Sequence, residues 1–163
     1  MKKILAVDDE PMVLDVIKTR LEFAGYAVIT AADGHEGMKK VRAEHPDLIV
    51  LDLILPGLNG YQICRILKGD DTTRRIPIIM LTARSQEKDV KEGMNSGADA
   101  YLTKPYETDE FVAKVKSLLE KTDLQHEDQV TADRYTTDRR TAFEQGHGNA
   151  PLPGGDSPSK QHK

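Results

Sequence analysis

The stretch MKKILAVDDEP, residues 1–11, joins a short apolar run to three consecutive acids and a proline. The run Ile4–Val7 contains no polar residue, which is typical of a strand buried on both faces of a parallel sheet. Pro11 is suited to the first turn of a helix, so the chain is predicted to pass from strand to helix here. The acids then lie at the carboxyl end of the strand, where parallel α/β sheets place their functional crevice.

The same alternation repeats along the chain. Helical apolar periodicity fills the segments between the runs, as in Val13, Ile17 and Leu21. Alternating strands and helices favour right-handed crossovers and a parallel sheet. We therefore predict an α/β fold, a doubly wound (βα)5 domain with a five-stranded parallel sheet over residues 1–122. The four further strands are expected at Ala27–Thr30, Leu48–Leu51, Ile78–Leu81 and Ala100–Leu102.

The fourth predicted helix differs from the others. Gln86–Ser96 offers only Val90 and Met94 for burial and contains Gly93. A helix with so little apolar surface gains little from packing, so it should be the least firmly held of the five.

The composition changes at Asp123. Only eight of the last 41 residues are hydrophobic, too few to offset the entropy of ordering them. Residues 123–163 are therefore predicted to form a polar, mostly disordered tail. A helix around Asp133–Glu144 is a weaker alternative, because its threonines disfavour it.

Charge and cysteine content limit the possible functions. The net charge is −4 and the basic residues are scattered, so we expect no nucleic-acid partner. Cys64 is the only cysteine, which excludes an internal disulfide and fits a cytoplasmic location. The run behind Met1 is too short for a signal peptide or a membrane span, so we expect a soluble, unprocessed protein without a membrane partner.

Polar residues recur where the predicted strands end. Asp8 and Asp9 follow the first strand, Asp52 the third, Thr82 the fourth and Lys104 the fifth. Carboxylates gathered at one edge of the sheet would repel one another unless a cation lay among them. Oxygen ligands, few in number, are the preference of Mg²⁺.

Four motifs at these positions together resemble the receiver domain of bacterial two-component response regulators, in the single-domain, chemotaxis-Y-like form. The resemblance covers residues 1–122 and implies a flavodoxin-like fold. It also implies a stand-alone signalling switch rather than an enzyme, one that catalyses only its own phosphorylation and dephosphorylation. The motifs are VDDEP, LDLILPGLNG, LTAR and GADAYLTKP.

The resemblance assigns roles residue by residue. It implies that Asp52 accepts a phosphoryl group from a histidine kinase or phosphotransfer protein. Asp9 and Asp52 would bind Mg²⁺ directly, together with the backbone carbonyl of Ile54, and Asp8 would act through a metal-bound water. A carboxylate attacks phosphorus poorly because anion meets anion, so neutralising cations are a chemical requirement.

Three further residues are implied to carry the signal. Thr82 resembles the hydroxyl that turns to the new phosphoryl group, Lys104 the ammonium that pairs with it, and Tyr101 the aromatic side chain that swings inward. The readout surface would be the fourth helix, the fifth strand and the fifth helix, which bind a downstream protein target. A monomer or a phosphorylation-dependent dimer is expected.

Other readings remain beside this one. Taken alone, the acids at residues 8–10 could cap a helix, the expected role of Glu10. A phosphohydrolase of the haloacid-dehalogenase type would need a second aspartate where Ile54 stands. A degenerate receiver acting as a scaffold would lack site residues that this sequence has. A transcription regulator would need an output domain, which the 41-residue tail is too short to supply.

Overall fold

Five parallel strands form one sheet, as predicted, and the structure gives their order as β2-β1-β3-β4-β5. The alignment of β1 on β3 pairs Val7 with Leu51, so the next residues along the chain, Asp8 and Asp52, leave the sheet side by side. β3 and β4 are buried along their whole length, as their continuous apolar runs indicate. The strand bounds are β1 Lys3–Val7, β2 Ala27–Ala31, β3 Leu48–Leu51, β4 Ile78–Thr82 and β5 Ala100–Thr103.

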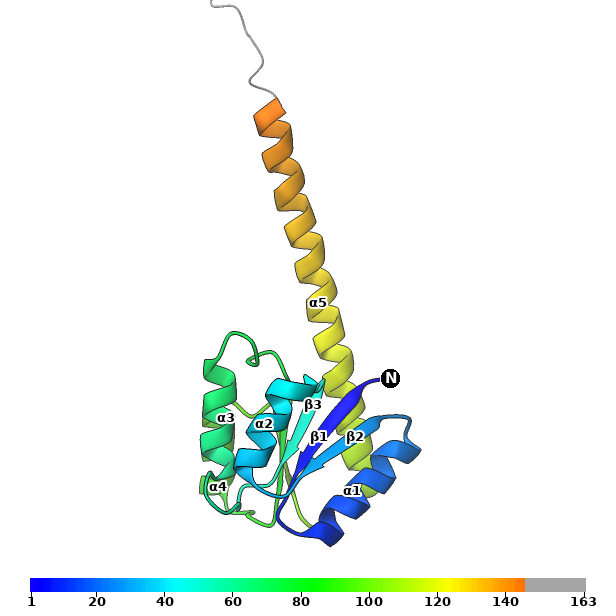
Figure 1. Cartoon of the computed structure of the whole chain (residues 1–163), viewed down its shortest axis with the longest axis vertical. Helices are drawn as coiled ribbons and strands as arrows, with labels where there is room; N and C mark the ends of the chain where they lie inside the picture. Colours follow the sequence, from blue (N-terminus) through cyan, green and yellow to red (C-terminus); the bar gives the residue numbers. More distant parts are fainter. Residues whose placement is uncertain (146–163) are drawn as a thin grey trace, which may run out of the picture. The chain divides into compact units, whose positions relative to one another are not determined.

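In this computed structural model the backbone is described for residues 1–145 and the side chains for residues 1–134. Helices cover both faces of the sheet (Figure 1). One core joins the sheet to α1 and α5 through Leu21 and Phe111, and the other joins it to α2 and α3 through Val41 and Cys64. The helix bounds are α1 Pro11–Phe23, α2 Gly34–Glu44, α3 Gly60–Gly69, α4 Glu87–Asn95 and α5 Thr108–Gln145.

Cys64 lies in the second core, on α3. Its side chain is fully buried, in the same cluster as Leu67 and Ala98. Burial raises the pKa of the thiol, and a hydrogen bond with Ser96 lowers it by less. The thiol is therefore a packing group in the folded protein.

α4 is held to the sheet differently from what the sequence predicts. Met94 was expected to be buried, but its side chain is 46% exposed, and Val90 is only partly buried. Gly93 faces inward instead, because a Cβ there would lie 2.8 Å from the ring of Tyr101 and 3.1 Å from the sulfur of Met80. The prediction of weak apolar packing therefore holds, although the residues that face the sheet are different ones.

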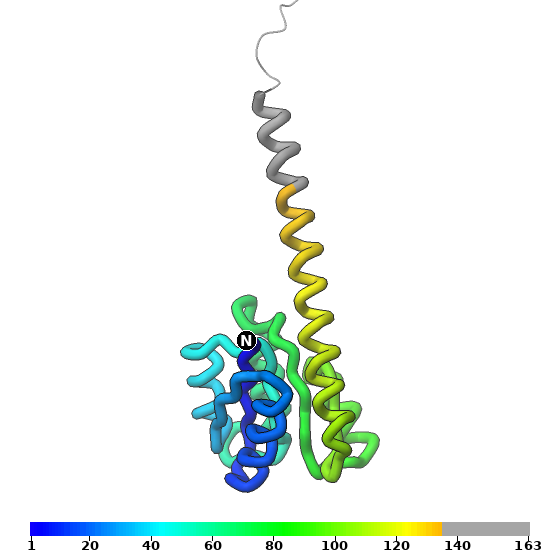
Figure 2. Tube along the Cα trace, turned by 90° about the vertical axis from the view of Figure 1, so that its right-hand side faces the viewer, coloured from blue at the N-terminus to red at the C-terminus, as the bar shows by residue number. Residues whose placement is uncertain are grey.

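α5 is longer than predicted. It continues past residue 122 to Gln145. The coloured part of the trace in Figure 2 follows α5 beyond residue 122. Residues 123–145 are therefore helical where the sequence predicts disorder. Thr108–Gln145 contains no glycine or proline, so nothing interrupts the backbone hydrogen bonds once the packed first turns have formed the helix.

The chain divides into two units, Met1–Gln125 and His126–Lys163. The first contains the whole sheet and both cores. Residues 146–163 lie outside the described residues, so disorder there stays a prediction. None of the helices in the described part of the chain is long and apolar enough to span a membrane.

Candidate functional site

The carboxyl ends of β1, β3, β4 and β5 bring four polar side chains to one edge of the sheet. Asp8 follows β1, Asp52 follows β3, Thr82 ends β4 and Lys104 follows β5. Lys104 Nζ donates a hydrogen bond to Asp8 Oδ2 at 2.8 Å and lies 3.5 Å from Asp52 Oδ2. The structure thus gathers side chains that are distant in the sequence into one charged cluster.

The cluster is largely shielded from solvent. Asp8 is 2% exposed, Asp52 7% and Thr82 0%. Burial raises the pKa of Asp52, and the charge of Asp8 raises it further, against the lowering effects of Lys104, the Ile54 N–H and Thr82. Burial alone would lower the pKa of Lys104, but the hydrogen bond to Asp8 and the charges of both aspartates raise it above its ordinary value.

An acidic cluster formed by Asp8, Asp9 and Glu10 adjoins these side chains, so carboxylate groups outnumber ammonium groups at this edge of the sheet. Oxygen atoms of Asp8, Asp9 and Glu10 lie within 4.8 Å of one another, and Asp52 adds a fourth carboxylate beside Lys104. Asp9 and Glu10 are exposed, whereas Asp8 is buried. An excess of hard oxygen donors over one fixed cation fits a divalent metal ion of the Mg²⁺ type.

Glu10 fulfils its expected role only in part. It occupies the N-cap position of α1, but its side chain makes no capping hydrogen bond. Instead its backbone N–H donates to Asp8 Oδ1 at 3.0 Å. The Glu10 carboxylate therefore belongs to the acidic cluster rather than to the helix cap. The capping interpretation did not predict this position.

The loop after β3 brings the chain back close to Asp52. The Ile54 N–H donates to Asp52 Oδ1 at 3.3 Å, while the Ile54 side chain is 52% exposed. Gly60 begins α3 directly against this turn, since a Cβ there would lie 2.6 Å from the carbonyl oxygen of Asp52. Asn59 and Gln62 cap the helix reciprocally. The loop therefore has little freedom to move away from Asp52.

A chain of contacts leads from the cluster to α4. Thr82 Oγ1 accepts a hydrogen bond from the Arg84 N–H at 3.4 Å. The Arg84 carbonyl in turn accepts from the Tyr101 hydroxyl at 2.7 Å, and the Tyr101 ring lies against Gly93 of α4. Burial and nearby negative charge raise the pKa of Tyr101 to about 12. Thr82 and Tyr101 are thus joined through the backbone of one loop residue.

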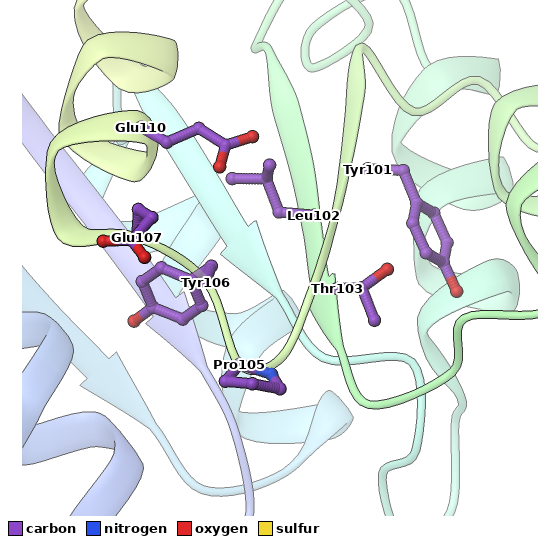
Figure 3. A pocket seen from close by; sticks show the side chains of 7 residues that line it. All are labelled: Tyr101, Leu102, Thr103, Pro105, Tyr106, Glu107 and Glu110. Atoms are coloured by element: carbon purple, nitrogen blue, oxygen red, sulfur yellow. The ribbon is translucent and has the colours of Figure 1, made fainter.

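A cavity of about 440 Å³ opens beside β5. Figure 3 shows Tyr101 and Thr103 on one side of the strand and Leu102 on the other. The cavity has an acidic lining because Glu107 and Glu110 contribute their carboxylates. The sequence analysis did not predict this cavity, since acids at the start of a helix are expected from the helix dipole alone. The full lining is Tyr101, Leu102, Thr103, Pro105, Tyr106, Glu107 and Glu110.

Curated relatives match the receiver part of the chain. The DNA-binding dual master transcriptional regulator RpaA of Synechocystis is 46% identical over 123 residues, which is 76% of this chain and 51% of RpaA. The alkaline phosphatase synthesis transcriptional regulatory protein PhoP of Bacillus subtilis is also 46% identical over 123 residues, 76% of this chain and 50% of PhoP. The chain spans about half the length of these relatives.

These relatives contradict the prediction that no nucleic acid is among the partners. They are DNA-binding or transcriptional regulators by name, the class that the sequence argument set aside. That argument was incomplete because it considered only the charge and length of this chain, and a segment matching half of a protein does not determine what the whole protein binds. The curated relatives likewise give no support to the stand-alone form.

A solved structure extends the likeness to the fold. The chemotaxis protein CheY4 of Vibrio cholerae superposes with a TM-score of 0.68 at 30% identity, covering 72% of this chain and 98% of CheY4. The sequence also matches the family described as the response regulator receiver domain over residues 4–116. That range includes all four strand-end side chains of the cluster, and the chain therefore belongs to the response regulator receiver domain family.

Proposed function

We propose that this receiver accepts a phosphoryl group on Asp52. The proposal rests chiefly on one observation: Asp52 is a buried carboxylate directly after the central strand, and it lies 3.5 Å from the ammonium of Lys104. Its pKa is raised because burial disfavours the charged form of the carboxylate, and groups with shifted pKa values are common at functional sites.

The chemistry is transfer between two nucleophiles. An Asp52 oxygen forms a bond to phosphorus as the bond from phosphorus to the donor breaks, and the donor leaves with the electron pair. Lys104 stabilises the charge on the phosphoryl oxygens, after releasing part of its interaction with Asp8. Asp9, Asp52 and the Ile54 carbonyl would hold Mg²⁺, with Asp8 acting through water. The metal supplies charge neutralisation.

The donor in this proposal is a phosphorylated histidine of a cytoplasmic kinase or phosphotransfer protein. A phosphohistidine is a suitable donor because its phosphorus–nitrogen bond breaks readily and the phosphoryl group passes to a carboxylate. The site is open on the side of Asp9 and Ile54, which are both exposed. A partner side chain can therefore approach Asp52 from that side.

The output of the switch is proposed to pass through Thr82. If the Thr82 hydroxyl turns to a phosphoryl group, it gives up the Arg84 N–H, and the loop that carries the Arg84 carbonyl is released. Tyr101 then loses its hydrogen-bond acceptor, and the loop that leads into α4 loses the contact that joins it to β5. The readout surface is accordingly α4, β5 and the start of α5, which includes the cavity of Figure 3.

The phosphoacceptor is tested by intact mass. Acetyl phosphate with Mg²⁺ should add one phosphoryl group to the parent protein, and chelation of the metal should prevent it. Asp52→Ala should abolish the adduct, whereas Asp71→Ala, at an exposed loop acid, should keep it. A metal-dependent adduct that survives Asp52→Ala would refute the assignment.

Coupling is tested separately with Thr82→Ala. This variant should still take up the phosphoryl group, because Asp52, Lys104 and the acidic cluster are unchanged. Amide exchange in residues 84–106 should respond to phosphorylation in the parent protein and not in the variant. The same response in both would show that the signal does not pass through Thr82.

Control of DNA binding is a second candidate function, favoured by the names of the relatives. In this form the receiver would regulate a DNA-binding segment or subunit in the natural protein. Chromatin immunoprecipitation of that protein should enrich particular promoters when Asp52 is intact and lose them in Asp52→Ala. Equal or absent enrichment in both would leave only a protein target as the output.

A further inference from the structure

A buried carboxylate lies under α4 that the phosphoacceptor site does not use. Asp89, in the first turn of α4, is only 9% exposed. Its Oδ2 is buried and accepts no hydrogen bond from any residue that the structure describes. A buried carboxylate oxygen without a donor destabilises the arrangement that contains it.

Two tyrosine hydroxyls close to Asp89 are bonded elsewhere. Tyr61 donates to the backbone carbonyl of Asp89 at 3.0 Å, and Tyr101 donates to the carbonyl of Arg84 at 2.7 Å. Burial raises the pKa of both phenols, and the charge of Asp89 raises it further, which places both in the field of this carboxylate. Potential donors are therefore near Asp89, but none of them reaches its Oδ2.

Few contacts compensate for this unfavourable group. Gly93 is the only other residue of α4 that is buried, and Gln86 provides no side-chain cap at the N-terminus of the helix. Hydrophobic packing of α4 is weak, so one unsatisfied carboxylate oxygen is a substantial part of the free-energy balance that sets the position of the helix.

We propose that Asp89 biases α4 toward leaving its present position. Its Oδ2 is unsatisfied while the Arg84 carbonyl holds the Tyr101 hydroxyl, and this oxygen gains a hydrogen-bond partner when the β4–α4 loop moves. This inference rests on the proposed function, because the loop movement is the one that phosphorylation of Asp52 is proposed to cause. Asp89 is thus a positioning residue that makes the switch easier.

The bias follows from linkage. A group that destabilises one of two conformations shifts the population toward the other, and a ligand of the second conformation then binds more tightly. Asp89 should therefore lower the folding stability of the unphosphorylated protein and raise its affinity for a phosphoryl mimic. A purely structural acid would have the opposite effect on stability.

The test uses Asp89→Ala and Asp89→Asn, with Glu87→Ala as the matched control. Glu87 lies in the same first turn and contributes the same charge to the helix N-terminus, but it is exposed. Asp89→Ala should raise the melting temperature of the unphosphorylated protein by about 3 °C or more, and Asp89→Asn should raise it by less. Glu87→Ala should leave it unchanged or lower it slightly, since it loses only a favourable dipole interaction.

The second readout is the affinity for beryllium fluoride with Mg²⁺, measured by calorimetry. Asp89→Ala should weaken binding by about fivefold or more, while Glu87→Ala should match the parent. Lower stability in Asp89→Ala and Asp89→Asn, or unchanged affinity in both, would overturn the inference while the proposed function stands. Beryllium fluoride binding that persists in Asp52→Ala would instead refute the proposed function. The melting temperatures would still decide whether Asp89 destabilises the present position of α4.

Discussion

Replacing Lys104 by methionine should destabilise the folded protein and change how its stability depends on pH. The substitution keeps an unbranched side chain and removes the ammonium that lies 2.8 Å from Asp8 and 3.5 Å from Asp52. Removing one partner of a buried ion pair typically costs about 3–5 kcal/mol. Lys104 keeps 21% of its side chain exposed, so solvent screens part of this interaction and we expect a loss of about 2–3 kcal/mol.

The loss translates into a measurable shift in melting temperature. The unit Met1–Gln125 that contains the site unfolds with an entropy of roughly 2.1 cal/mol/K per residue, which gives about 8–12 °C for this loss at neutral pH. The pKa of Lys104 is raised in the folded protein, so its contribution is fully present below the unfolded value of about 10.4 and disappears only above it.

The deficit should shrink in acid. Lys104 lowers the pKa of Asp52, so in the variant this pKa rises further above its unfolded value. A carboxyl group with a raised folded pKa contributes stability below its unfolded pKa and loses it as the pH rises through the folded pKa. The variant therefore regains stability between pH 7 and about pH 4 as Asp52 takes up a proton.

Thermal unfolding from pH 7 to pH 4, with and without Mg²⁺, measures these effects. Lys68→Met is the matched control. The Lys68 side chain is shielded to a similar degree, and its ammonium lies 2.8 Å from Asp99, in an ion pair outside the phosphoacceptor site. Mg²⁺ should restore stability in Lys104→Met more than in the parent or in the control, since it replaces a lost positive charge. A deficit that is the same at pH 7 and pH 4, or that Mg²⁺ leaves unchanged, would refute the electrostatic account of the cluster.

Three further predictions address single residues. Asp9→Asn should weaken Mg²⁺ binding more than Asp8→Asn, because loss of an outer partner typically costs about 10–100-fold in affinity while loss of a direct ligand costs more; calorimetric titration would show equal losses if the ranking were wrong. Ile54→Ser should shorten the life of the phosphorylated protein, because the exposed side chain then no longer obstructs water; an unchanged decay in a mass-spectrometric time course would contradict this. The Tyr101 hydroxyl should ionise only near pH 12. Difference absorbance between the parent and Tyr101→Phe should therefore show no tyrosinate from this residue at lower pH. Ionisation near the ordinary pKa of tyrosine would disprove its burial against α4.

The sheet could be predicted from sequence because each strand carries its own signal. Ile78–Thr82 and Leu48–Leu51 are uninterrupted apolar runs, and such runs have few alternatives to a buried parallel strand. The edge of the sheet that carries Asp8, Asp52 and Lys104 follows directly, since parallel strands end on the same side. The prediction that these three side chains lie at one edge of the sheet therefore needed only the positions of the parallel strands in the sequence.

The face of α4 could not be predicted in the same way. Apolar periodicity selects Met94, but the space above Tyr101 admits only a glycine, so the helix turns Gly93 inward. Asp89 follows Gly93 to the inside because residues four apart share a face. The shape of a neighbouring ring, which no periodicity records, decided which residues are buried.

The length of α5 also escaped prediction. Composition indicates whether a segment can form a core, and residues after Asp123 cannot. A helix that begins on packed residues such as Phe111 and Val115 needs no core of its own to continue, because each further residue adds one backbone hydrogen bond.

The single thiol of Cys64 makes the parent protein its own reporter of opening. It is fully buried in the packing of α3, and the protein has no other cysteine. A thiol reagent can therefore modify the folded chain only after that part of the core has opened, at a rate set by how often it does so. Labelling kinetics with and without Mg²⁺ or a phosphoryl mimic would measure how strongly each ligand closes this side of the sheet, without any engineered probe.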